Sequence, residues 1–150
     1  TLEPESIDLL VFNPPYVPTD SAEVVRVDAT EFAKLNKFDS EDALRKVEAE
    51  TLLPATWAGG NAGREVIDEF LKRVRKILKP DTGRCFLCGV MDNRPEELAA
   101  LALTNYGLGS EIVRRDVERG IEQLWVMKMW VEKPKNEGER KKWETNCNTE

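Results

Sequence analysis

Hydrophobic residues recur along the chain with the spacings of alternating strands and helices. The apolar runs Ile7–Phe12 and Arg84–Val90 have the length and composition of buried strands. Between them, Arg64–Leu78 carries apolar residues on one face at helical spacing: Val66, Ile67, Phe70, Leu71, Val74, Ile77 and Leu78. This part of the chain therefore predicts a strand, a helix and a second strand, in that order.

The second half of the chain continues the alternation and ends in a predicted hairpin. A helix is expected from Pro95 to the residue before Gly107, because proline favours a helix start and glycine a helix end. Two strands follow at Glu111–Val117 and Glu122–Val131, joined around Arg119-Gly120. Apolar residues on both sides of the last strand predict that both of its faces are covered, with its Met and Trp residues in the core. The order predicts an α/β fold, the closing half of a Rossmann-like doubly wound sheet with a C-terminal antiparallel hairpin.

Two polar stretches complete the organisation. Residues 17–56 form a long connection, in which a helix is expected from Glu41 to Leu53, before Pro54. This connection is either a solvated insertion or a lid over a site, and its weak apolar stripe favours the insertion. Residues 132–150 are polar and are expected to be a disordered tail. The predicted domain therefore spans residues 1–131, with a tail at 132–150.

The tetrapeptide Asn13-Pro14-Pro15-Tyr16 directly follows the first predicted strand. Two prolines fix two φ angles, remove two backbone donors and keep the preceding residue out of the helical region. The Asn13 amide oxygen and the Pro14 carbonyl are therefore expected to be preset acceptors, which match the two N–H groups of an amide or exocyclic amine. Tyr16 offers a flat face for a planar group. The alternative is a turn that only ends the strand, since these residues are common in turns.

A strand followed by Asn-Pro-Pro-Tyr resembles the substrate-amine motif of methyltransferases that use S-adenosylmethionine. The segment Trp57–Val66, with sequence WAGGNAGREV, resembles the one that follows this motif in the eukaryotic release-factor glutamine methyltransferases, relatives of bacterial HemK. The resemblance covers about residues 7–131 and is to the C-terminal half of that family only. It implies that Asn13 and Pro14 are catalytic, that Pro15 and Tyr16 bind substrate with them, and that Asn13 also borders the cofactor.

The same resemblance implies S-adenosylmethionine as methyl donor, a glutamine of a translation termination factor as substrate, and a small zinc-binding activator subunit as partner. The glycine-rich loop after the first strand of such domains and the acidic residue for the ribose have no counterpart here. We therefore expect this chain alone to be inactive and not to bind the cofactor. The alternatives are a non-catalytic interaction module, a nucleic-acid adenine methyltransferase and a protein lysine methyltransferase.

Charge and cysteine usage narrow these alternatives. The net charge is −6 with a pI of about 4.9, and residues 20–50 hold nine acidic against five basic residues, so a nucleic-acid partner is not expected. No membrane-spanning run is present, and the absence of histidine excludes histidine-based relays. Cys85 and Cys88 lie three apart on a strand and so face opposite ways, which argues against a metal site. Three thiols without a disulfide framework suit a cytoplasmic or nuclear protein.

Overall fold

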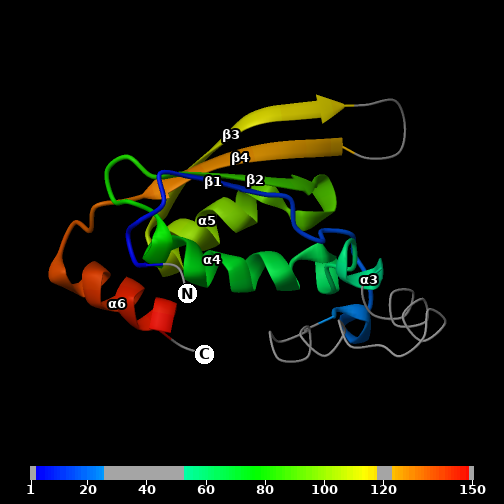
Figure 1. Cartoon of the computed structure of the whole chain (residues 1–150), viewed down its shortest axis with the longest axis horizontal. Coiled ribbons are helices and arrows are strands. Elements are labelled where there is room, and N and C mark those ends of the chain that lie inside the picture. The colour runs from blue at the N-terminus through cyan, green and yellow to red at the C-terminus, as the bar shows by residue number, and fades with distance from the viewer. Residues whose placement is uncertain (1–2, 26–52, 118–122, 149–150) are drawn as a thin grey trace, which may run out of the picture.

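A mixed four-stranded sheet forms the centre of the chain (Figure 1). The computed structural model describes residues 3–25, 53–117 and 123–148. Within these residues the strand order is β1-β2-β4-β3, where β1 is Leu9–Phe12, β2 Arg84–Val90, β3 Leu108–Val117 and β4 Gln123–Val131. β1 runs parallel to β2, and the other two pairings are antiparallel. The predicted α/β class with a C-terminal antiparallel hairpin is confirmed.

Three helices lie on one side of this sheet, α4 (Glu65–Ile77), α5 (Pro95–Tyr106) and α6 (Glu137–Asn148) (Figure 1). Short helical turns occur at η1 (Ser21–Glu23), α3 (Leu53–Ala55), η3 (Asn61–Gly63) and η4 (Met91–Asn93). The core lies between the sheet and the three long helices. Its fully buried members are Ile67, Leu71, Val74, Leu78, Cys85, Leu87, Leu98, Ala102, Leu108, Met127 and Met129.

The opposite face of the sheet carries no helix among the residues that the structure describes. Leu9 and Val11 of β1 are 62% and 66% exposed on this face, and Leu124 of β4 is 40% exposed. Within the described residues, the expectation that the last strand is covered on both faces is not met: alternate residues of β4 from Trp125 to Met129 are buried, and those between them are not. A hydrophobic run does not distinguish a covered face from one that is apolar but open. We call this surface the open face.

The C-terminal segment also differs from expectation. Residues 137–148 form α6 instead of a disordered tail, and the Trp143 ring is buried against Gly107 and the end of α5. The Trp143 indole N–H donates to the Thr104 carbonyl at 3.3 Å, and the Arg75 guanidinium lies 5.0 Å from the ring centroid. Composition suggested disorder because one aromatic anchor is hidden among many charged residues. The division into a domain and a tail at residue 131 stays a prediction.

The predicted elements otherwise agree closely with the structure. β2 has its predicted bounds, α4 is one residue shorter at each end, and α5 runs from Pro95 to a left-handed Gly107 with φ of 61°. β3 begins at Leu108, three residues earlier than predicted. The helix expected from Glu41 and the Arg119-Gly120 turn lie outside the described residues. Cys85 is buried on the helix side and Cys88 is only partly buried, so the two thiols lie on opposite faces as predicted.

Candidate functional site

The motif loop, Asn13–Tyr16, begins where β1 ends, at the carboxyl edge of the two parallel strands. Its first residue is exposed and its second, Pro14, is fully buried. The strand is held in place behind it, because the Phe12 ring packs on the Phe70 ring of α4 at a centroid distance of 4.3 Å. A buried proline directly after Asn13 anchors the loop while the Asn13 side chain stays accessible. This arrangement suits a group that binds a substrate.

Tyr16 is less free than the sequence suggests. Its side chain is partly buried and packs against the hydrophobic core. Core packing limits the ring to few orientations, so any planar group must approach the part that remains at the surface. The stacking role of Tyr16 stays a prediction.

A short parallel bridge between Val17 and Ala58 continues the motif loop. The Val17 N–H donates to the Trp57 carbonyl at 3.0 Å, and the Val17 carbonyl accepts from the Gly59 N–H at 2.9 Å. Thr19 and Gly60 are also joined by two hydrogen bonds of 3.0 Å each. The Thr19 N–H donates to the Gly60 carbonyl, and the Gly60 N–H donates to the Thr19 hydroxyl. The chain leaving the motif is therefore tied to residues that lie some forty positions later.

The segment Gly59–Gly63, which we call the glycine turn, packs backbone against backbone on the motif loop. A Cβ atom added at Gly59 would lie 2.7 Å from the Pro15 carbonyl oxygen, and one at Gly63 only 1.9 Å from the Tyr16 carbonyl oxygen. Gly63 also has φ of 67°, a left-handed conformation that side chains disfavour. The turn leads into α4, but its glycines make room for the chain itself and not for a ligand phosphate.

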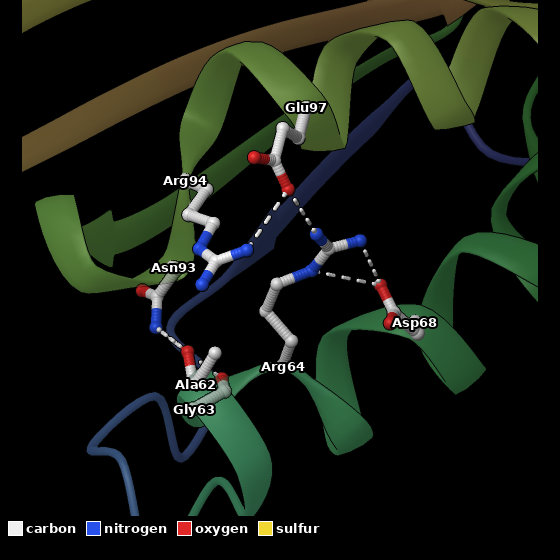
Figure 2. A network of polar contacts seen from close by, with 7 residues as sticks. All are labelled: Ala62, Gly63, Arg64, Asp68, Asn93, Arg94 and Glu97. Carbon is white, nitrogen blue, oxygen red and sulfur yellow. Dashed lines mark hydrogen bonds and ion pairs between the residues drawn. The ribbon is translucent and has the colours of Figure 1, made fainter.

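Asn93, at the end of η4, is a polar residue that is fully buried, and no other polar or charged residue among those described is buried. Its Oδ1 accepts from the Val90 N–H at 2.8 Å, which fixes the side chain to the end of β2. Its amide nitrogen donates to the Tyr16 carbonyl at 2.8 Å. The same nitrogen donates to the Ala62 carbonyl at 2.9 Å, with the Gly63 carbonyl at 3.4 Å (Figure 2). One side chain therefore joins β2, the motif loop and the glycine turn.

Ion pairs join the two helix starts beside this point (Figure 2). Arg64 donates to Asp68 at 2.9 Å and lies 3.8 Å from Glu97, which also accepts from Arg94 at 3.5 Å. Arg94 is left-handed, with φ of 53°, as is Ala62 in the glycine turn, with φ of 52°. Non-glycine residues in this region carry strain, and such strain gathers where a surrounding structure fixes it. Backbone strain and polar contacts thus concentrate around Asn93.

The two thiols of β2 are not activated. Burial raises the pKa of the Cys88 thiol, and burial raises the pKa of Cys85 to about 12. Both therefore stay protonated near neutral pH and are poor nucleophiles. No cluster of three or more His, Cys, Asp or Glu side chains suited to a metal ion occurs within residues 3–25, 53–117 and 123–148. No helix in the same residues has the length and hydropathy to cross a membrane.

Comparison with known proteins adds the decisive observation. No family model matches the chain. The human methyltransferase HEMK2 is 34% identical over 124 residues, which are 83% of this chain and 45% of that protein. The eRF1 methyltransferase catalytic subunit mtq2 of Schizosaccharomyces pombe is 25% identical over 124 residues, 83% of this chain and 43% of that protein. This chain is a homologue of part of these methyltransferases. It spans less than half the length of the curated HEMK2 and Mtq2 relatives that it matches.

A solved structure of a further relative is also similar in sequence to this chain. It is the Encephalitozoon cuniculi Mtq2–Trm112 complex, described as responsible for methylation of the eRF1 translation termination factor. Its identity is 29%, its TM-score 0.49, and the match covers 86% of this chain and 54% of that chain. The predicted resemblance to this group of methyltransferases is confirmed, whereas the roles of Asn13, Pro14, Pro15 and Tyr16 stay predictions.

Sequence reasoning brought out the motif loop but not what holds it. Asn93 had no role in the site predicted from the sequence, and no short-range pattern distinguishes it. Two of its hydrogen-bond partners, Tyr16 and Ala62, lie 77 and 31 residues earlier in the chain. The three glycines between residues 59 and 63 were a visible signal of close backbone approach, although their partner was not.

Proposed function

We propose that this chain is the substrate-recognising part of an S-adenosylmethionine-dependent protein methyltransferase that acts on a glutamine of a translation termination factor. The observation that carries the proposal is the 34% identity to HEMK2 over 124 residues of this chain. The exposed Asn13 at the carboxyl end of β1 supports it. Ligands of α/β sheets bind beyond the carboxyl ends of their strands, which is where the motif loop lies. A cytoplasmic or nuclear location follows as part of the same proposal, supported by three free thiols.

The proposed role of the motif loop is to accept hydrogen bonds from the N–H groups of the substrate. A carboxamide nitrogen has two such groups and a delocalised lone pair, so it is a weak nucleophile. The Asn13 amide oxygen and the Pro14 carbonyl would accept these two donors and hold the nitrogen in one orientation. Both acceptors also favour the positive charge that develops on nitrogen as its bond to carbon forms.

The described residues do not make a cofactor pocket by themselves. The glycine turn before α4 has the composition of a nucleotide-binding loop, but the Pro15 and Tyr16 carbonyl oxygens already lie against Gly59 and Gly63. Of the residues named so far, Asn13 alone would border a bound methyl donor. We propose that the open face and the free edge of β1 carry the rest of the methyltransferase domain, because the relatives are more than twice as long as the matched segment.

A protein acceptor and a second subunit complete the proposal. The yeast relative is named as a catalytic subunit, which supports assembly with a further chain. The net charge of −6 favours a peptide over a polyanionic nucleic acid, since nucleic-acid binding depends on phosphate neutralisation. The small zinc-binding activator is proposed from the resemblance described above.

The first test uses a complete methyltransferase that contains this segment, together with its activator subunit. Methyl transfer is measured to a glutamine-bearing termination-factor peptide, to the same peptide with glutamate in place of that glutamine, and to an adenine-bearing oligonucleotide. We expect transfer to the glutamine peptide alone, with little dependence on salt. Transfer to the oligonucleotide alone supports an adenine methyltransferase instead, and transfer to a lysine elsewhere in the peptide supports the lysine alternative.

In the same assay, Asn13→Ala removes one acceptor of the reacting nitrogen. Loss of one such transition-state partner costs about 2.7–4 kcal/mol, so turnover should fall by roughly two to three orders of magnitude. The exposed Leu103→Ala on α5 is the control and should keep normal turnover. Near-normal turnover of Asn13→Ala would mean that the motif only ends the strand.

The second test concerns the open face. In the complete protein, Val11→Lys would bury a charge if the rest of the domain covers this face, whereas Leu103→Lys keeps its charge in solvent on the helix side. We expect a large fall in Tm for Val11→Lys alone. Equal Tm values for the two variants would show that the face stays open, which favours the alternative of an interaction module that recruits a separate partner.

Isothermal titration of this chain alone with S-adenosylmethionine should show no heat of binding.

A further inference from the structure

The single side chain of Asn93 determines how the motif loop sits relative to β2. Its Oδ1 is committed to the Val90 N–H, and its amide nitrogen reaches carbonyls of two other segments. Every buried side-chain nitrogen and oxygen among the described residues has a partner. A buried amide that meets its donors and acceptors in this way holds its neighbours in one arrangement, because any shift leaves a buried polar group unpaired.

The geometry selects asparagine at this position. An aspartate of the same shape would keep the bond from the Val90 N–H but would place a carboxylate against the Tyr16, Ala62 and Gly63 carbonyl oxygens. An apolar residue would leave those carbonyls and the Val90 N–H without their partner. The side chain must therefore accept on one side and donate on the other, which among similarly sized residues is the property of a carboxamide.

The connection from Tyr16 back to Asn13 is unusually stiff. Between them lie Pro14 and Pro15, whose rings fix two φ angles, and Pro14 is fully buried. Because this connection has little flexibility, a restraint on the Tyr16 carbonyl also restrains the position of Asn13. The glycine turn closes the other side, because it leaves no space for the Tyr16 carbonyl to move toward Gly63.

We propose that Asn93 is a positioning residue of the methyltransferase site, which sets the Asn13 acceptor by holding the Tyr16 carbonyl against the end of β2. It does not touch the substrate and acts through the motif loop. This inference rests on the proposed function for its effect on turnover. Its structural part, the restraint on the motif loop, is independent of any activity.

The test compares Asn93→Asp with Asn146→Asp. Asn146 also donates from its amide nitrogen to a backbone carbonyl, that of Asn105 at 3.0 Å, but it joins α6 to α5 far from the motif loop. Both variants make the same chemical change at a partly or fully buried amide. Each is made in the complete methyltransferase with its activator, and kcat and KM are measured with the glutamine peptide.

Hydrogen–deuterium exchange of the same proteins supplies a readout that needs no activity. In Asn93→Asp we expect at least tenfold faster exchange of the Val17 and Gly59 amides, with unchanged exchange in α6. The hydrogen bonds of these two amides join Val17, the residue after the motif loop, to Trp57 and Gly59. We also expect kcat to fall by about ten- to a hundredfold with little change in KM, because displacement of a reacting group by about 1 Å costs about that much. Asn146→Asp should show the opposite exchange pattern and near-normal kcat.

Either of two results overturns the proposal: unchanged exchange at Val17 and Gly59, or a kcat for Asn93→Asp equal to that of Asn146→Asp. If Asn93→Asp unfolds, shown by fast exchange throughout β4, Asn93→Ala replaces it, because alanine sets no charge against the carbonyls, and the same two criteria apply. A wild-type protein that methylates no acceptor contradicts the proposed function, and the exchange result alone then decides whether Asn93 holds the motif loop.

Discussion

Gly63→Ala should be one of the most damaging single-methyl changes in this protein. Gly63 has φ of 67°, and a Cβ atom there would lie 1.9 Å from the Tyr16 carbonyl oxygen and 2.5 Å from the Asn93 amide nitrogen. The left-handed conformation costs an alanine about 1–2 kcal/mol, and making room in a packed site costs about 1–3 kcal/mol more. Lower entropy of the unfolded chain returns about 0.4–1 kcal/mol. The net loss in free energy of unfolding is therefore about 1–5 kcal/mol.

Urea unfolding followed by tryptophan fluorescence measures this loss, because Trp125 and Trp143 are buried and report on separate parts of the fold. Gly138→Ala is the matched control. A Cβ atom at Gly138 meets nothing closer than the Asn136 side-chain oxygen at 3.2 Å, and the residue lies in α6, where alanine is favoured by about 1 kcal/mol. A Gly63→Ala protein within about 0.5 kcal/mol of wild type would refute the close approach of the glycine turn to the motif loop.

Two further outcomes follow from the core and the C-terminal helix. Trp143→Ala should lower the free energy of unfolding by about 3–5 kcal/mol in urea titrations, as for other buried tryptophans. The control, Lys141→Ala at an exposed position, should change it little. Equal effects would mean that α6 does not pack on the rest of the fold. Burial raises the pKa of Cys85 from 9.0 to about 12, so the thiol ionises first in the unfolded state. The stability that the protonated Cys85 thiol contributes should be complete below about pH 9 and be lost as the pH rises toward 12. Urea titrations at about pH 8, 9 and 10 measure this loss, and the free energy of unfolding should fall less with pH for Cys85→Ala than for wild type.

The alternation of strands and helices was predictable because each element has its own periodicity. α4 has apolar residues at helical spacing, and β2 is a short apolar run closed by turns, so local sequence determines both. Pro95 and Gly107 likewise mark the two ends of α5 by local conformational preference. The coverage of the sheet was not predictable in this way. Whether an apolar face receives a helix depends on the whole topology, which no window of residues contains.

The candidate site shows the same limit. Asn13 and the two prolines could be identified because their chemistry lies in four consecutive residues. The contribution of Asn93 depends on carbonyl groups of segments far away in the chain, and any residue type has such carbonyls. The ordering of residues 137–148 was missed for a related reason. Two buried side chains, Trp143 and Cys147, outweigh the polar composition around them, because together they give α6 an apolar contact with the core.

The bridge between Val17 and Ala58 gives this protein freedom to vary. Since the two ends of the intervening segment are fixed by hydrogen bonds at Val17, Thr19, Gly59 and Gly60, that segment can gain or lose residues without moving the motif loop. Loop closure is only weakly sensitive to length, at about 0.6 kcal/mol for each doubling. Closure entropy thus sets only a weak limit on the length of the segment between these anchors. Evolution can change that length, and a protein engineer can place a tag or a reporter domain there, while the hydrogen bonds keep the geometry around Asn13.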